Sequence, residues 1–181
     1  MVMNSKELRE TIEVLLFSSD VPLTSKRMRL FTAGIPEQEI ETAVQELNES
    51  YISSGRVFEI RRLAGGYQLV TRKEYSELVR KFQHHRMSQR LSTAALETLA
   101  IVAYRQPITR LAIEEIRGVD VSGVLHTLLE RRLIRITGRD KGLGRPLLYG
   151  TTEEFLRYFG LNELSDLPNQ KEIIELLRQK S

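Results

Sequence analysis

The feature that most constrains the fold is a pattern that occurs twice in the chain, 85 residues apart. Pro22 follows one apolar-periodic stretch and Thr24 precedes the next, and Pro107 and Thr109 repeat this arrangement. In each copy we expect a helix before the proline, two further helices after the threonine, and then a strand–turn–strand. Three helices and a hairpin are typical of a winged helix-turn-helix. The sequence therefore predicts an α+β, mostly helical fold of two tandem winged helix-turn-helix domains plus a short C-terminal tail.

Length and composition allow two small domains and exclude several protein classes. At 181 residues the chain is too long for one winged helix and long enough for two. No stretch of about 18 uninterrupted apolar residues occurs, so we expect no membrane-spanning helix. The N-terminus lacks a basic region followed by an apolar block, so we expect no secretory signal and a cytoplasmic protein. The chain has no cysteine, which excludes disulfides and thiolate chemistry.

The first copy carries the start and turn signals of a winged helix. A capping box at Asn4 predicts the start of helix one, and Thr24 predicts the N-cap of helix two. Residues 56–63 and 67–71 predict the two strands of the wing, joined by an Ala-Gly-Gly turn. A last helix over residues 74–87 has four apolar side chains at helical spacing, which we expect to form its inner face. These side chains are Tyr75, Leu78, Val79 and Phe82.

The second copy repeats these signals. Four polar residues predict helix N-caps: Ser92, Thr109, Asp120 and Thr151. The first helix is expected to turn a face of four apolar residues toward the core: Leu96, Leu99, Ala100 and Ala103. Ile134 and Ile136 alternate with polar residues, which predicts a half-buried strand. Gly138, Gly142 and Gly144 predict a wing tip, and residues 146–149 predict the return strand.

We divide the chain into an N-terminal winged-helix domain (1–88), a C-terminal winged-helix domain (89–164) and a tail (165–181). The polar stretch 81–89 is the expected connector. Four apolar residues interrupt the otherwise polar tail: Ile173, Ile174, Leu176 and Leu177. These four could pack as a helix on a domain or on a partner, or the tail could be loosely held.

Neither third helix has the side chains of a DNA reader. The third helix of the first copy, over residues 36–49, carries five glutamates and no cation, so phosphate repulsion should keep it out of a DNA groove. The third helix of the second copy is expected to expose small or nearly neutral residues. These are Ser122, Gly123, His126, Thr127 and Glu130. Such a surface is also poorly suited to reading base edges.

A cluster of cations around the second wing is the remaining signal for nucleic acid. The cations are Arg131, Arg132, Arg135, Arg139 and Lys141, with Arg145 beyond them. They could contact phosphates without sequence preference. Alternatively, they are ordinary solvated charges that protect a strand edge.

No residue pattern predicts catalysis, a metal site or a cofactor. His84 and His85 are adjacent, which places them on different faces of a helix, and His126 is far away in sequence. Tyr104 and Arg105 close the first helix of the second copy. Either Tyr104 packs at the edge of the core and Arg105 lies against the helix C-terminus, or both are anchors for a protein partner.

Several motifs closely resemble the segregation and condensation protein B family. The second copy carries them in residues 96–109, 116–120 and 144–152, and residues 65–71 resemble the first wing of the same family. The resemblance extends over residues 8–168, nearly the whole chain.

The resemblance implies a bacterial non-enzymatic subunit that forms a homodimer, mainly through its N-terminal domain. It implies that the C-terminal domain docks the kleisin subunit, segregation and condensation protein A, and through it meets the structural-maintenance-of-chromosomes ATPase. That complex condenses and partitions chromosomes, so the chain would be nucleoid-associated, with weak or indirect DNA contact. Four motif positions are candidate partner contacts: Tyr104, Arg105, Arg145 and Tyr149. The competing hypothesis is a winged-helix transcription regulator, which would bind one DNA sequence selectively.

Overall fold

The structure is a computed structural model that describes residues 3–83, 91–169 and 172. The predicted connector beyond residue 83, with its two adjacent histidines, lies outside the described residues. The apolar tail residues predicted between 173 and 177 also lie outside them.

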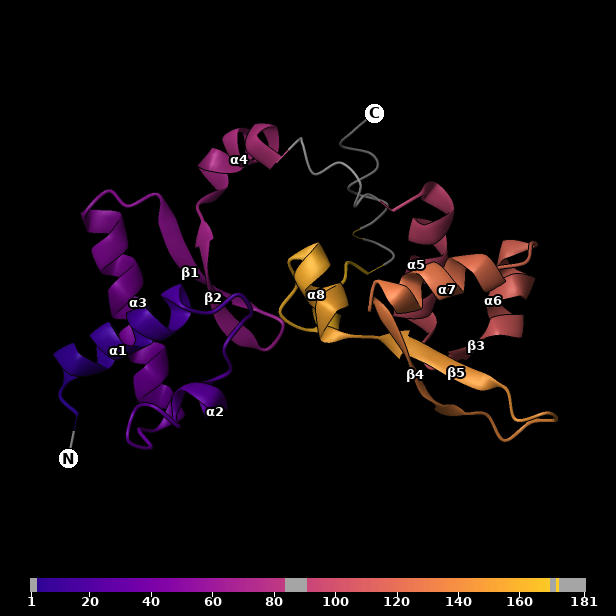
Figure 1. Ribbon diagram of the computed structural model, residues 1–181, viewed down its shortest axis with the longest axis horizontal. Coiled ribbons are helices and arrows are strands. Elements are labelled where there is room, and N and C mark those ends of the chain that lie inside the picture. Colours follow the sequence, from indigo (N-terminus) through magenta and orange to yellow (C-terminus); the bar gives the residue numbers. More distant parts are fainter. Residues whose placement is uncertain (1–2, 84–90, 170–171, 173–181) are drawn as a thin grey trace. The chain divides into compact units, whose positions relative to one another are not determined.

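The chain forms two compact units, Met1–Met87 and Ser88–Ser181, called here the first and second unit (Figure 1). Each unit places three helices ahead of a β-hairpin and a further helix after it. This order confirms the predicted α+β fold of tandem winged helices. The first unit contains α1 (Ser5–Phe17), α2 (Ser25–Met28), α3 (Glu37–Ser53), β1 (Phe58–Leu63), β2 (Gly66–Thr71), the 3-10 turn η1 (Lys73–Tyr75) and α4 (Ser76–Gln83).

Local capping chemistry sets the helix starts of the first unit. The Asn4 side chain accepts from the Glu7 amide at 2.9 Å, and the Glu7 carboxylate accepts from the Asn4 amide at 3.0 Å. Thr24 caps α2 by accepting from the Arg27 amide. Both caps confirm the sequence prediction. The core beneath these helices is aliphatic, with Ile12, Met28 and Ile40 all at 0% exposure.

The wing turn of the first unit is shorter than predicted. Only Ala64 and Gly65 form it, both with positive φ (49° and 73°), as expected for a two-residue hairpin turn that matches strand twist. Gly66 therefore belongs to β2. Its neighbour Tyr67 exchanges two backbone hydrogen bonds of 2.9 Å with Leu23, which adds a one-residue bridge to the edge of this two-stranded sheet.

The second unit repeats this plan with a complete third strand. It contains α5 (Thr93–Arg105), β3 (Ile108–Thr109), α6 (Arg110–Arg117), α7 (Ser122–Glu130), β4 (Ile134–Arg139), β5 (Leu147–Thr151), α8 (Glu153–Phe159) and the 3-10 turn η3 (Leu164–Asp166). The sheet order is β3-β5-β4, all antiparallel. Ile108 pairs with Tyr149 as Leu23 pairs with Tyr67, so the repeat seen in the sequence also holds in the strand pairing.

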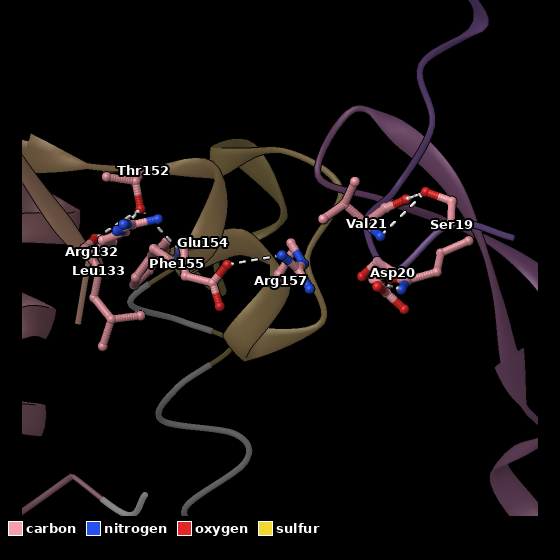
Figure 2. Close-up of polar contacts among 10 residues, drawn as sticks. Ser19, Asp20, Val21, Arg132, Leu133, Thr152, Glu154, Phe155 and Arg157 are labelled. Atoms are coloured by element: carbon pink, nitrogen blue, oxygen red, sulfur yellow. Dashed lines mark hydrogen bonds and ion pairs between the residues drawn. The ribbon is translucent and has the colours of Figure 1, made fainter. Parts of the chain in front are cut away.

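Two predicted caps of the second unit are displaced by one residue. Helix α7 begins after Val121, which provides no side-chain cap. The hydroxyl and amide of Ser122 instead donate to the Asp120 carboxylate, which lowers the pKa of that carboxyl. Helix α8 is capped by Thr152, not Thr151. Figure 2 shows why: the Thr152 hydroxyl accepts from the Phe155 amide and donates to the Arg132 carbonyl at 2.5 Å, which ties the cap to the turn before β4.

Two predicted apolar faces are also shifted. The buried stripe of α5 consists of Ala95, Thr98, Leu99, Val102 and Ala103. Leu96 and Ala100, predicted to face the core, are exposed. In β4, Ile134 is buried but Ile136 is 49% exposed, and a register shift lies between Ile136 and Gly138. Both isoleucines precede this shift and pair in register with Thr151 and Tyr149, so the shift does not cause the exposure of Ile136. Only the first residue of β4 is buried.

Arg117 ties the end of α6 to α5 and gives a stability prediction. Its guanidinium donates to the Ala94 carbonyl (2.9 Å) and the fully buried Thr98 hydroxyl (3.1 Å), and pairs with Glu97 (2.9 Å). Replacing it with methionine keeps the stem but removes these donors. We expect Arg117→Met to lower the free energy of unfolding by about 2 kcal/mol in a urea titration.

Arg110 on the same helix provides the control for this variant. Its side chain is 56% exposed and forms an i,i+4 pair with Glu114. We expect Arg110→Met to change stability by less than about 0.5 kcal/mol. Equal effects of the two substitutions would show that Arg117 does not hold α6 in place.

Candidate protein-interaction surfaces

The apolar face of α4 is exposed, although the sequence predicted it to be the inner face. Leu78 is 66% exposed and Phe82 is 84% exposed, one helical turn apart. Tyr75 and Val79 are only half-buried. Periodicity was right about which side of the helix is apolar, but the first unit does not cover that side. Two large neighbouring apolar side chains in water are typical of a surface that a partner buries.

A second apolar surface of the first unit surrounds a shallow groove at the end of α1 and α2. The groove has a volume of about 170 Å³ and is lined by Leu15, Ser18, Ser19, Leu23, Arg27, Met28 and Phe31. Beside it Leu30 is 78% exposed and Phe31 is 58% exposed. Sequence reasoning missed this surface, because the exposed Leu30 and Phe31 lie in the irregular stretch after α2, where no periodicity marks a face.

The recognition-helix position of the first unit, α3, presents carboxylates. Five of its glutamates are exposed: Glu37, Glu39, Glu41, Glu46 and Glu49. Glu46 pairs with Arg9 at 2.5 Å and Glu41 pairs with Arg62 at 3.1 Å. These pairs neutralise part of the negative charge, yet no cation lies on α3 itself. The surface remains unsuited to the phosphates of a DNA groove.

The corresponding helix of the second unit, α7, presents a small, nearly neutral surface. Gly123, His126 and Glu130 are exposed, while Ser122 and Thr127 are half-buried. His126 lies 3.3 Å from Glu130, one turn along the helix. No arginine, lysine, asparagine or glutamine in α7 is available for bidentate contacts with base edges.

Tyr104 and Arg105 lie together at the end of α5. Both side chains are exposed, with Tyr104 at 48%. The Tyr104 hydroxyl donates to the Pro168 carbonyl at 2.8 Å, so the exposed ring has its hydroxyl already bonded. Arg145 lies on a different element, the wing tip, where it is exposed and has a φ of 44°.

Tyr149 does not lie on the surface. It is 8% exposed and belongs to the core of the second unit. Its position in the repeat explains this placement, because it pairs with Ile108 as the buried Tyr67 pairs with Leu23. We therefore remove Tyr149 from the set of partner contacts. The equivalence could have been noticed in the sequence, but the two tyrosines are offset by 82 residues rather than 85.

The structure separates the cations that the sequence grouped at the second wing. Arg135, Arg139 and Lys141 are exposed on β4 and the wing tip, and Arg139 donates to the Arg145 carbonyl at 3.1 Å. Arg132 is exposed in the turn between α7 and β4. Arg131 instead lines a hollow of about 270 Å³ with Leu133, Glu154 and Tyr158. In the same region Glu154 pairs with Arg157 at 3.0 Å (Figure 2).

The polar side chains described in the two units form surface ion pairs and hydrogen bonds between elements. Among the described residues, no group of three or more His, Cys, Asp or Glu side chains could hold a metal ion. No helix in the described part of the chain is long and apolar enough to cross a membrane. Tyr51, whose pKa is raised by burial and by its hydrogen bond to Glu13, links α3 to α1.

The comparisons with known proteins agree on one family. A family model described as segregation and condensation complex subunit ScpB matches residues 10–170. Segregation and condensation protein B of Syntrophotalea carbinolica is 47% identical over 98% of this chain and 89% of its own length. The protein of that name from Symbiobacterium thermophilum is 52% identical over 87% of this chain and 71% of its own.

Among solved structures, the crystal structure of ScpB from Mycobacterium tuberculosis is 34% identical to this chain. It covers 87% of this chain and 98% of its own, with a TM-score of 0.41. Because the family model extends over most of the chain and the two sequence relatives share about half of its residues, the chain belongs to the segregation and condensation complex subunit ScpB family.

Proposed function

We propose that this chain is a non-enzymatic subunit of the bacterial SMC–kleisin complex that condenses and partitions chromosomes. In this role it forms a homodimer and binds the kleisin, segregation and condensation protein A, in the cytoplasm. Membership of a family described as a complex subunit supports protein partners. The observation that carries the proposal is the pairing of uncovered apolar faces with an acidic α3, which suits polypeptide better than DNA.

The first unit would form the dimer, and α4 would lie in the interface. Leu78 and Phe82 project from one side of this helix. A two-fold interface uses the same patch on both copies, so an apolar stripe that repeats along a helix can pack on its own symmetry mate. The dimer would remove both side chains from water.

The second unit would dock the kleisin. Tyr104, Arg105 and Arg145 are exposed and belong to residue types that often anchor interfaces. Tyr104 offers a flat apolar ring whose hydroxyl is already satisfied, so covering the ring leaves no unpaired donor. Arg105 and Arg145 add two cations for an acidic segment.

The double variant Tyr104→Ala with Arg145→Glu tests this surface. We expect it to weaken binding of the kleisin's central segment about thirtyfold to several-hundredfold in calorimetry, since two anchors of about 1–2 kcal/mol each contribute about 2–4 kcal/mol together. The matched control is Leu111→Ala with Lys141→Glu, which also removes one exposed apolar side chain and reverses one exposed charge. Unchanged affinity in the test variant would remove Tyr104 and Arg145 from the kleisin surface.

The wing cations support a weaker, second activity: non-specific contact with DNA. Four exposed cations can neutralise phosphates without reading bases: Arg132, Arg135, Arg139 and Lys141. Fluorescence anisotropy with random duplex DNA should show binding that falls about a hundredfold between roughly 50 and 200 mM salt, as expected for about four phosphate contacts. A thousandfold preference for one duplex sequence would instead indicate a transcription regulator.

A further inference from the structure

The tip of the second wing presents a leucine side chain fully to solvent. Leu143 has a relative exposure of 105%, the highest among the large apolar side chains in the described part of the chain. It lies in the turn between β4 and β5, whose hairpin extends from the body of the second unit (Figure 1). A single exposed leucine is ordinary on a protein surface, so its surroundings decide whether it has a role.

A hydrogen-bonded turn carries this leucine. The Arg145 amide donates to the Gly142 carbonyl at 3.0 Å, so these residues close a β-turn with Leu143 at its second position. Gly144, at the third position, has a φ of 76°, which is typical of a type II turn and which glycine adopts without strain. The turn therefore holds Leu143 at the outermost point of the hairpin.

The two glycines beside Leu143 make the tip narrow. A Cβ on Gly142 would meet only the Asp140 carboxylate, at 3.8 Å, and its φ is not positive, so neither space nor backbone conformation requires glycine there. On both sides of Leu143 the chain is bare backbone. Such a tip suits the minor groove of DNA, which is only about 6 Å wide.

Cations stand immediately before the leucine. Arg139 and Lys141 are exposed, and Arg139 uses one N–H for the Arg145 carbonyl at 3.1 Å, which leaves further donors for a phosphate. Asp140 is the one carboxylate in the sequence from residue 131 to residue 149, and it accepts from the Lys141 amide at 2.6 Å. The tip thus combines phosphate-binding cations with one apolar side chain, as minor-groove proteins do when they insert a wedge between bases.

Two other kinds of partner fit this tip less well. One leucine offers too little apolar surface for stable anchoring on a lipid membrane, which takes a larger apolar face or a second anchor. A hot spot for a protein partner lies among neighbouring side chains that exclude water, whereas the neighbours of Leu143 are Gly142 and Gly144. A wedge between base pairs needs only one narrow apolar side chain, so DNA is the partner that the tip fits.

We propose that Leu143 is a wedge that the second wing inserts into the minor groove of DNA, between two neighbouring base pairs, while Arg139 and Lys141 contact the flanking phosphates. The inference rests on the non-specific DNA contact proposed above and adds how the wing makes it. Because the wedge must unstack a base step, it binds best where stacking is already weak, as at a mismatch or a flexible pyrimidine–purine step. The wedge does not use the Arg145 side chain, which the kleisin surface needs.

Fluorescence anisotropy with two labelled duplexes tests the wedge in the full chain. Both have the same random sequence, and one contains a central mismatched pair. We expect the unsubstituted chain to bind the mismatched duplex about fivefold more tightly, because a mismatched base costs less to unstack. Leu143→Ser should remove this preference and leave the affinity for the perfect duplex within about twofold, since the phosphate contacts remain.

Two further variants control for the loss of a leucine. Leu111→Ser removes a leucine that is 64% exposed on α6, away from the wing, and should keep the preference. Leu143→Phe replaces one wedge side chain with another and should also keep it. Leu143 contributes nothing to the core, and an unchanged thermal midpoint verifies that its variants fold.

The outcomes separate the wedge from the DNA contact on which it rests. A preference that survives Leu143→Ser, or equal binding of both duplexes by the unsubstituted chain, would overturn the wedge and leave the DNA contact in place. Failure to bind either duplex would overturn both. Sedimentation with vesicles of phosphatidylcholine and phosphatidylserine tests the lipid alternative: without a mismatch preference, vesicle binding that Leu143→Ser abolishes would make the tip a membrane contact and overturn the wedge.

Discussion

Leu78→Glu should convert the dimer into a monomer at micromolar protein concentration. The α4 face that carries Leu78 and Phe82 is exposed in the single chain and would be buried in the dimer. A two-fold interface places the new carboxylate in both copies, where two like charges would lose water together. We expect at least about 3 kcal/mol of lost association energy, which corresponds to a dissociation constant raised about a hundredfold.

Ser76→Glu on the other side of α4 is the matched control. Ser76 is exposed at the first position of the helix, where a carboxylate is favoured by the helix dipole. We expect this variant to remain as dimeric as the unsubstituted chain on dilution in light scattering. If Leu78→Glu also stays dimeric at the same concentrations, α4 does not lie in the dimer interface.

Gly66→Ala should destabilise the first unit by about 3 kcal/mol, the upper end of what overpacking usually costs. A Cβ at position 66 would lie 2.8 Å from the Leu23 carbonyl carbon and 2.9 Å from its oxygen. These are backbone atoms, so no side-chain rotation can relieve the clash. The same backbone of Leu23 is held by two hydrogen bonds to Tyr67, and moving it would break this one-residue bridge to β2.

Gly123→Ala makes the same chemical change where the structure leaves room. Gly123 lies in α7 with nothing within 4 Å of the added Cβ, so we expect stabilisation by about 0.5–1 kcal/mol from helix propensity. Hydrogen exchange followed by mass spectrometry measures each unit separately. A Gly66→Ala chain whose residues 3–83 exchange as slowly as in the unsubstituted protein would show that β2 and Leu23 are not packed as described.

The local elements of this fold were accessible from the sequence because their signals are local. Asn4, Thr24, Ser92 and Thr109 all act as N-caps through an amide three residues away. Where two neighbouring residues could both act as the N-cap, as at the start of α8, the prediction chose the wrong one. Thr152 caps α8 in place of Thr151, because the Thr152 hydroxyl also donates to the Arg132 carbonyl, 20 residues earlier in the chain.

The candidate surfaces were harder to predict, since periodicity identifies an apolar face but not what covers it. The α4 face was expected inside and lies outside. Leu96 and Ala100 were likewise assigned to the core, one step around the helix from the residues that are buried. For Tyr149 the error was the opposite: its family motif predicted an exposed partner contact, but its pairing with Ile108 places it in the core.

Size-exclusion chromatography with light scattering, with and without the kleisin's central segment, measures both dimerisation and kleisin binding. We expect the mass of two chains for the protein alone, and a heavier complex that contains two chains and the kleisin segment when both are present. The mass of a single chain, unchanged by the kleisin segment, would contradict this expectation.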